Sequence, residues 1–261
     1  MKTKKNLYTK IFNSNFFYTG IGIILLIISY IILSTSLKTA LVPKIDKIIF
    51  SMGELLKEKS FYKNFFTTIF KLLFTTTFTF IFAVVLALIS ANFKRFVGII
   101  KPFIVVLKSF PTICILLILI SITKFSEHIV LFLVVFPIVY EGQLERSQTI
   151  IKQYEYDLKL DGITRWNRVV HIILPLSYKE FIILLLQSVG LGFKSLIMAE
   201  VVTGSSTKLG IGNFLNSAYI NSNYNMMFAI AFYTLIFIIV IDCILEYLKY
   251  RLSGKEEGLI S

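Results

Sequence analysis

The feature that most constrains this chain is a series of long apolar runs, several of which are long enough to cross a lipid bilayer. An α-helix needs about 20 apolar residues to span the hydrocarbon core. Backbone N–H and C=O groups meet no water in that core, so only helices or closed barrels can cross it. The composition agrees, because 56% of the residues are hydrophobic, 16% are charged and the mean hydropathy is +0.78. We therefore predict an all-α membrane protein rather than a soluble domain.

The apolar runs predict about six transmembrane helices. Their approximate limits are 16–37, 65–91, 102–122, 128–140, 181–198 and 226–245. We accordingly divide the chain into a tail at 1–15, a transmembrane domain at 16–250 and a second tail at 251–261. The first run is too long for a typical signal peptide and lacks a clear cleavage site, so we predict that it is retained. Residues 38–64 repeat isoleucines and leucines at helical spacing, which predicts an amphipathic helix on the outer surface.

The distribution of basic residues predicts the orientation. With six spans both termini lie on one side, and the segments there hold about twice as many Lys and Arg residues as those on the other. Cytoplasmic segments carry this excess, so both termini and the loop at 142–180 are predicted to be cytoplasmic in a multi-pass protein of the cell membrane. The net charge of +12 then reflects contact with anionic membrane lipid rather than binding of nucleic acid.

A charged island at residues 156–175, YDLKLDGITRWNRVVHIILP, lies between two apolar runs. Gly162 separates two segments of helical period and suits the left-handed residue that ends the first helix. Thr164 is the predicted N-cap of the second helix, and Pro175 is predicted to end it. Trp166 shares a face with the apolar residues that follow it, so we expect it to be a buried anchor. The island is therefore predicted to form two short helices joined by a tight turn.

The same island resembles the cytoplasmic coupling loop of binding-protein-dependent ABC importer permeases of the nitrate, sulfonate and taurine type. The positions in register with that pattern are Gly162, Thr164, Arg165, Trp166, Leu174 and Pro175. Where the family has an acidic residue followed by two alanines, this chain has Tyr156, Asp157 and Leu158. The resemblance implies the type I importer permease fold and a loop that docks on ABC ATPase subunits. It further implies an extracytoplasmic binding protein and a second permease, expected to be a copy of this chain. No cofactor is expected on this chain, because ATP and Mg belong to the ATPase.

Further positions match this family pattern and suggest a translocation path. Lys108 lies three residues before Pro111, where a kink is expected in the third run. Ala199 and Glu200 are followed by a segment rich in glycine and serine, so Glu200 is expected to open an outer loop and shape a gate. Lys194 lies deep in the fifth run, where an ionisable residue is costly unless it faces protein or water. Lys108, Pro111, Lys194 and Glu200 are the candidate path residues for a small, anionic solute of the sulfonate, taurine, nitrate or vitamin-precursor type. The alternative for Lys194 is a structural role, in which its side chain reaches the interface or pairs with a carbonyl or carboxylate of another helix.

Other functions remain as alternatives. The chain lacks a G-x-x-x-x-G-K-[ST] phosphate loop, so it is not expected to hydrolyse ATP itself or to be an enzyme. An ion-coupled secondary transporter would need intramembrane acids or broken-helix ion sites, and no internal repeat supports one. An intramembrane enzyme would need a catalytic cluster that the spans do not offer. Cys114, Cys243, His128 and His171 have no ligand-like spacing, so no metal site is expected.

Overall fold

The computed structural model describes residues 18, 21–22, 24–25, 28–36, 41–160, 163–204 and 208–253. Gly162, the predicted tail at 1–15 and much of the first apolar run lie outside these residues. From residue 41 onward the elements are α2 (Ile45–Leu55), α3 (Lys59–Asn92), α4 (Lys94–Ser109), α5 (Thr112–Ile122), α6 (Ser126–Gln153), α7 (Glu155–Leu160), α8 (Arg165–Arg168), the π-helical turn η1 (Val169–Ile173), α9 (Leu174–Leu176), α10 (Tyr178–Thr203), α11 (Ile211–Ile220) and α12 (Tyr224–Ser253). The described ranges contain helices and no strands, which confirms the all-α prediction.

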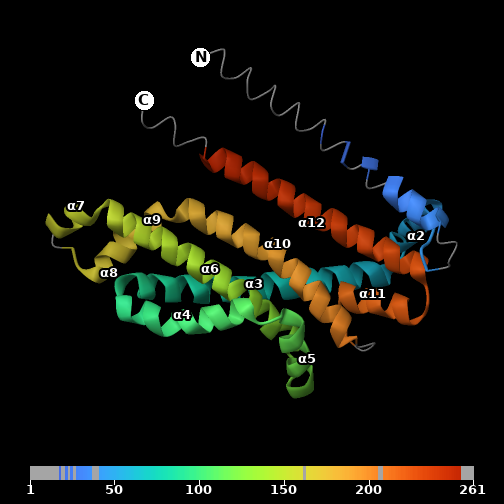
Figure 1. The fold of residues 1–261 in the computed structure, drawn as a ribbon, viewed down its shortest axis with the longest axis horizontal. Coiled ribbons are helices and arrows are strands. Elements are labelled where there is room, and N and C mark those ends of the chain that lie inside the picture. Colours follow the sequence, from blue (N-terminus) through green and yellow to red (C-terminus); the bar gives the residue numbers. More distant parts are fainter. Residues whose placement is uncertain are drawn as a thin grey trace, which may run out of the picture.

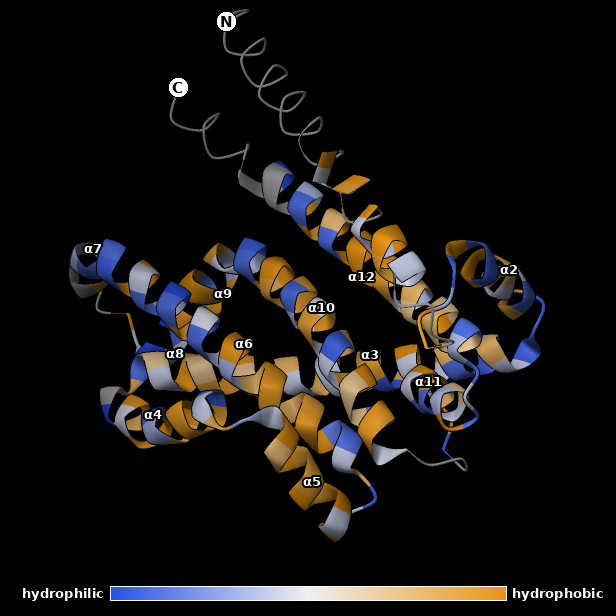
Figure 2. Cartoon of the chain, turned by 45° about the vertical axis from the view of Figure 1, so that its right-hand side comes forward, coloured by the Kyte–Doolittle hydropathy of each residue, from blue (hydrophilic) through white to orange (hydrophobic). Residues whose placement is uncertain are grey.

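Four helices are long and apolar enough to cross a membrane: α3, α6, α10 and α12. The pair α4 and α5 would make a fifth span, but the two helices are bent by 96° at the break between them. Figure 2 shows hydrophobic residues along these helices and hydrophilic residues gathered around α7. The described residues therefore support 4 to 5 spans, and the remaining predicted span, 16–37, is interrupted by residues that are not described.

The third predicted run is a bent pair and not one straight span. Phe110 takes an extended conformation with ψ of 130° and ends α4, because a residue that precedes a proline is pushed out of the helical region. Pro111 then caps α5. The kink predicted at Pro111 is confirmed, and its size means that α4 and α5 do not form one straight helix.

The core joins α3, α6 and α10, which lie beside one another in Figure 1. Gly192 on α10 permits this approach, because a Cβ there would lie 2.9 Å from Leu131 of α6 and 3.2 Å from Leu72 of α3. Small residues at helix contacts allow such packing in membranes, where apolar burial alone supplies no driving force between helices. The helix α6 begins at Ser126 and runs on to Gln153, so the short fourth run is part of a much longer helix.

The predicted amphipathic helix before the second span is present as α2. It buries Ile48 and Leu55, and the Tyr233 hydroxyl of α12 donates to the Met52 carbonyl at 3.0 Å. In Figure 1, α2 and α11 lie at one end of the long helices and α7, α8 and α9 at the other. The helix bundle thus has two ends, and each contains one of the candidate sites described below.

Candidate functional site

The predicted two-helix loop forms α7, α8, η1 and α9 at one end of the bundle (Figure 1). Thr164 caps α8 as predicted: its backbone is extended, and its Oγ1 accepts a hydrogen bond from the N–H of Asn167 at 3.4 Å. Arg165 is the first residue of α8, and Asp157 lies in α7. Helices are therefore present on both sides of the predicted turn, and the turn itself, with Gly162, lies outside the described residues.

Pro175 does not end the second helix, so that prediction is wrong. It lies inside α9 together with Leu174, and only Ser177 separates α9 from α10. A proline is tolerated in the first turn of a helix, where its missing N–H would have no helical partner. The polypeptide therefore continues from the loop into α10 almost without interruption.

Trp166 is not the buried anchor that the periodicity predicts. Its side chain is 71% exposed, and that of Tyr156 on α7 is 75% exposed. Val169 and Ile173 are buried instead, within the core that α3, α4 and α6 share. Trp166 lies in the first turn of α8, whereas the buried Val169 and Ile173 belong to η1, which follows it. The loop consequently presents two large aromatic side chains outward.

The loop is fastened to the bundle by three arginines. Arg168 Nη2 donates to Asn92 Oδ1 at 2.6 Å, at the last residue of α3. The Arg165 guanidinium lies over the ring of Phe93, 5.3 Å from its centroid. Arg146 of α6 donates to the carbonyl of Leu176 at 3.1 Å. Burial, and then the charge of Arg165, lower the pKa of the Arg168 guanidinium, which still remains protonated.

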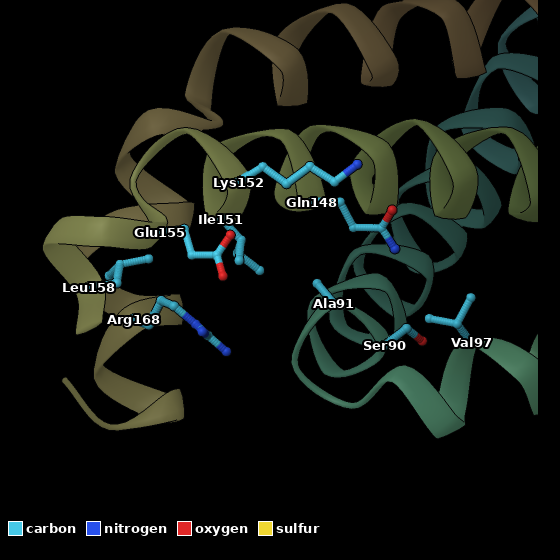
Figure 3. A pocket seen from close by; sticks show the side chains of 9 residues that line it. All are labelled: Ser90, Ala91, Val97, Gln148, Ile151, Lys152, Glu155, Leu158 and Arg168. Atoms are coloured by element: carbon cyan, nitrogen blue, oxygen red, sulfur yellow. The ribbon is translucent and has the colours of Figure 1, made fainter. Parts of the chain in front are cut away.

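A cavity of about 520 Å³ separates this loop from the ends of the spans. Its lining residues come from α3, α4, α6, α7 and α8: Ser90, Ala91, Val97, Gln148, Ile151, Lys152, Glu155, Leu158 and Arg168. Figure 3 shows Arg168 and Glu155 extending into this space from the loop, across from Ser90 and Ala91. The loop is thus held to the bundle at a few points and not packed against it throughout.

A second candidate site is a buried charged cluster nearer the opposite end. Lys71 of α3 donates from Nζ to Glu127 Oε2 of α6 at 2.7 Å and to Glu200 Oε1 of α10 at 3.0 Å. A third bond runs from the same ammonium to the carbonyl of Leu209 at 2.8 Å. The side-chain exposures are 16% for Lys71, 4% for Glu127 and 0% for Glu200. Lys208 adds a second positive charge, 3.6 Å from Glu127 Oε1. Each carboxylate is therefore paired, as buried charges require.

The segment after Lys208 closes over Glu200. Glu200 accepts from the N–H of Gly212 at 2.9 Å and from the hydroxyl of Thr68 at 2.9 and 3.0 Å. The N–H of Gly210 donates to Asn64 Oδ1 at 2.8 Å. A Cβ on Gly210 would lie 2.6 Å from Glu200 Oε2, and one on Gly212 would lie 2.6 Å from the carbonyl of Ile197. Both glycines are needed because the chain approaches the carboxylate and the α10 backbone this closely.

The cluster lies far from the loop along α3. Asn92, which holds the loop, is 21 residues beyond Lys71, and a helix rises 1.5 Å per residue, which places them about 30 Å apart. This separation is about the thickness of the hydrocarbon core. The two candidate sites therefore sit at opposite faces of the membrane-spanning part.

The four predicted path residues do not come together in one site. Glu200 is one turn inside α10, which ends at the left-handed Gly204, so the prediction that Glu200 opens an outer loop is wrong. Lys108 pairs with Glu141 of α6 at 2.6 Å. Pro111 stands at the bend between α4 and α5. Lys194 has an exposed side chain on α10, and no ion pair involving it is found among the described residues.

Sequence reasoning missed the charged cluster. Neither Lys71 nor Glu127 is among the candidate residues taken from the sequence, whereas the structure pairs them across helices. One signal was available in the sequence, since Lys71, Glu127 and Glu200 are ionisable residues within or beside apolar runs. Their pairing was not visible, because 129 residues separate Lys71 from Glu200. Among the described residues, no group of three or more His, Cys, Asp and Glu side chains could hold a metal ion.

Comparison with known families decides what these sites belong to. The family described as binding-protein-dependent transport system inner membrane component matches residues 80–254. The chain belongs to this family. No curated protein matches the chain significantly. The matched range covers the loop, its arginine anchors and Glu127 and Glu200, while Lys71 lies just before it. This permease is thus an inner-membrane component of a binding-protein-dependent transport system, and its family places it with ABC transporters.

Proposed function

We propose that this permease is the transmembrane subunit of an ATP-driven importer and that its loop docks on a separate ABC ATPase. The observation that carries this proposal is the outward position of Trp166 and Tyr156 on a loop whose other side is anchored in the core. Tryptophan, tyrosine and arginine are the residues that most often dominate binding energy at protein interfaces. The eight residues of this docking surface are Tyr156, Asp157, Gly162, Thr164, Arg165, Trp166, Leu174 and Pro175.

The mechanism that follows is alternating access. Two permeases, which we propose to be copies of this chain, pair about a two-fold axis, and each docks its loop on one ATPase subunit. The ATPases bind ATP and Mg, and their closure moves the loops. A binding protein delivers the solute from the outside, while the loops and both termini face the cytoplasm.

We further propose that the solute is a small anion of the nitrate, sulfonate, taurine or vitamin-precursor type. Lys194 supports this proposal, because its ammonium is exposed on α10 and has no ion pair among the described residues. Lys108 is already paired with Glu141, so it would contribute to the path through that pair. Glu200 is enclosed in the charged cluster and would act by holding the gate region together.

The charged cluster argues against an ion-coupled secondary transporter. Such a transporter needs carboxylates that an ion or a proton can reach during the cycle. Here Lys71 and Lys208 already neutralise Glu127 and Glu200, and the segment 209–212 closes over Glu200. The Lys71 ammonium therefore lies beside Glu127 and Glu200, where a secondary transporter would bind its coupling cation.

The proposal is tested by measuring binding of the permease to its partner ABC ATPase. Trp166→Ala is expected to weaken co-purification of the two proteins by about thirtyfold, the effect of losing a hot-spot residue worth about 2 kcal/mol. Tyr219→Ala provides a matched control, because this tyrosine is also exposed but lies on α11 at the other end. Equal binding of wild type and both variants would refute the docking surface.

A further inference from the structure

The junction between α3 and α4 is held by two arginines of the loop. Arg168 donates to Asn92 at 2.6 Å, and Arg165 lies over the ring of Phe93. Phe93 is the single extended residue that separates the two helices, with φ of −126° and ψ of 92°. The loop therefore contacts the hinge between α3 and α4 rather than the side of one helix.

Both partners of the Arg168–Asn92 bond are fixed on their own elements. Asn92 Nδ2 donates to the carbonyl of Leu88 at 2.9 Å, which orients Oδ1 toward the loop. Arg168 directly precedes η1, whose residues Val169 and Ile173 are buried in the core. Since neither side chain is free to reorient, a displacement of the loop is passed to the end of α3 and the start of α4.

The helix α4 is suited to move as a unit. Within its 16 residues only Ile100 and Ile104 are buried hydrophobic residues of the core. Its first end is the Phe93 hinge, and its other end is the 96° bend before α5. Near that second end, Lys108 binds Glu141 of α6, and this partly exposed pair can exchange with water.

The cavity beside the junction provides room for such a movement. Protein interiors are closely packed and contain few voids larger than a water molecule. By contrast, the space of about 520 Å³ between the loop and the ends of α3, α4 and α6 is partly open to the outside and is not filled by side chains. Arg168 itself lines the cavity (Figure 3), and its Nε is buried without a hydrogen-bond partner, so a movement of the whole loop can bring it a bond while Nη2 stays on Asn92.

We propose that Arg168 is a positioning residue that links the ATPase-driven loop to α4 through Asn92. When the loop moves into the cavity, Arg168 carries the α3–α4 junction with it, and α4 transmits the displacement to the bent α4–α5 pair. This inference rests on the proposed function, since it assumes that an ATPase moves the loop. It adds the route by which the movement enters the membrane domain.

The test uses the full transporter in proteoliposomes, with ATPase and binding protein, and measures solute uptake and ATP hydrolysis together. Asn92→Leu removes the acceptor while roughly keeping the side-chain volume, and Arg168→Gln removes the charge. Each is expected to lower uptake per ATP hydrolysed about tenfold, within the range of coupling free energies between sites. Basal ATP hydrolysis, measured without the binding protein, should remain within about twofold of wild type because docking is unchanged, whereas its stimulation by the binding protein should fall together with uptake because coupling is reciprocal.

Three further variants distinguish a loss of coupling between the loop and α4 from a loss of folding. Asn92→Asp retains the acceptor and should keep the wild-type ratio of uptake to hydrolysis. The double variant Arg168→Gln, Asn92→Leu should be no worse than either single variant, because both remove one interaction. Asn167→Ala changes the exposed neighbour of Arg168 and should leave the ratio unchanged.

A wild-type ratio in both Asn92→Leu and Arg168→Gln overturns the proposal. Loss of ATPase binding in these variants also overturns it, because Arg168 would then act in docking. If Asn92→Leu does not fold, Arg168→Lys replaces it, since it keeps the charge and removes the planar guanidinium. A wild-type permease that neither binds nor stimulates the ATPase would instead refute the proposed function itself.

Discussion

Replacing Lys71 with methionine tests the buried charged cluster most directly. The variant removes the ammonium that pairs with Glu127 and Glu200, and it leaves two buried carboxylates close to one another. Removing one partner of a buried ion pair costs about 3–5 kcal/mol, mostly because the remaining charge is not compensated. For a chain of this size each kcal/mol shifts Tm by roughly 2–4 °C, so we expect a decrease of about 10 °C. Thermal unfolding of the detergent-solubilised permease, followed by gel filtration, measures this shift.

Two further variants separate the ion pair from simple loss of a side chain. Adding Glu200→Gln to Lys71→Met removes the carboxylate that has lost its ion pair, since Lys208 still lies 3.6 Å from Glu127, and should restore about half of the lost stability. Lys57→Met is the control, because Lys57 pairs with Glu54 on the surface with side-chain exposures of 79% and 56%. Such exposed pairs contribute about 0–1 kcal/mol, so Tm should shift by no more than roughly 2 °C. A Lys71→Met protein that melts like the Lys57→Met protein would refute the reasoning.

Two other predictions follow from the same end of the bundle and from α10. Gly212→Ala is expected to lower Tm by about 5 °C, because overpacking costs typically 1–3 kcal/mol and the new Cβ would lie 2.6 Å from the Ile197 carbonyl. Gly53→Ala, where a Cβ meets no atom within 4 Å, should leave Tm unchanged or raise it, and equal effects of the two substitutions would contradict the packing argument. Lys194→Gln is expected to reduce uptake of an anionic solute about tenfold at unchanged protein level, since a path-lining ammonium attracts the anion. Lys194→Arg should retain uptake, and unchanged uptake in Lys194→Gln would leave Lys194 with a structural role only.

The sequence was sufficient for properties that depend on neighbouring residues. Hydropathy predicted the membrane-spanning helices, because a span is a continuous stretch of chain. Thr164 was recognised as an N-cap because the residue type and its position before an apolar period define the cap locally. The break at Pro111 was predictable for the same reason, since the proline restricts the residue directly before it.

Periodicity failed at the ends of helical segments. Trp166 was assigned to the buried face that Val169 and Ile173 share, but it lies in the first turn of α8, and the buried residues belong to the π-helical turn that follows. Pro175 was taken as a stop, although it falls in the first turn of a new helical segment, where no hydrogen bond is lost. Neither the π-helical turn nor the new helix start has a signal in the apolar pattern.

Only the tertiary structure decided which charged residues meet. Lys71, Glu127 and Glu200 come from three different helices, and their pairing depends on how α3, α6 and α10 pack around Gly192. The Arg168–Asn92 bond likewise joins residues that are 76 positions apart. A charge in an apolar run tells only that a partner is required, because burial without one is too costly. The identity of that partner follows from the packing of distant segments, which no local pattern encodes.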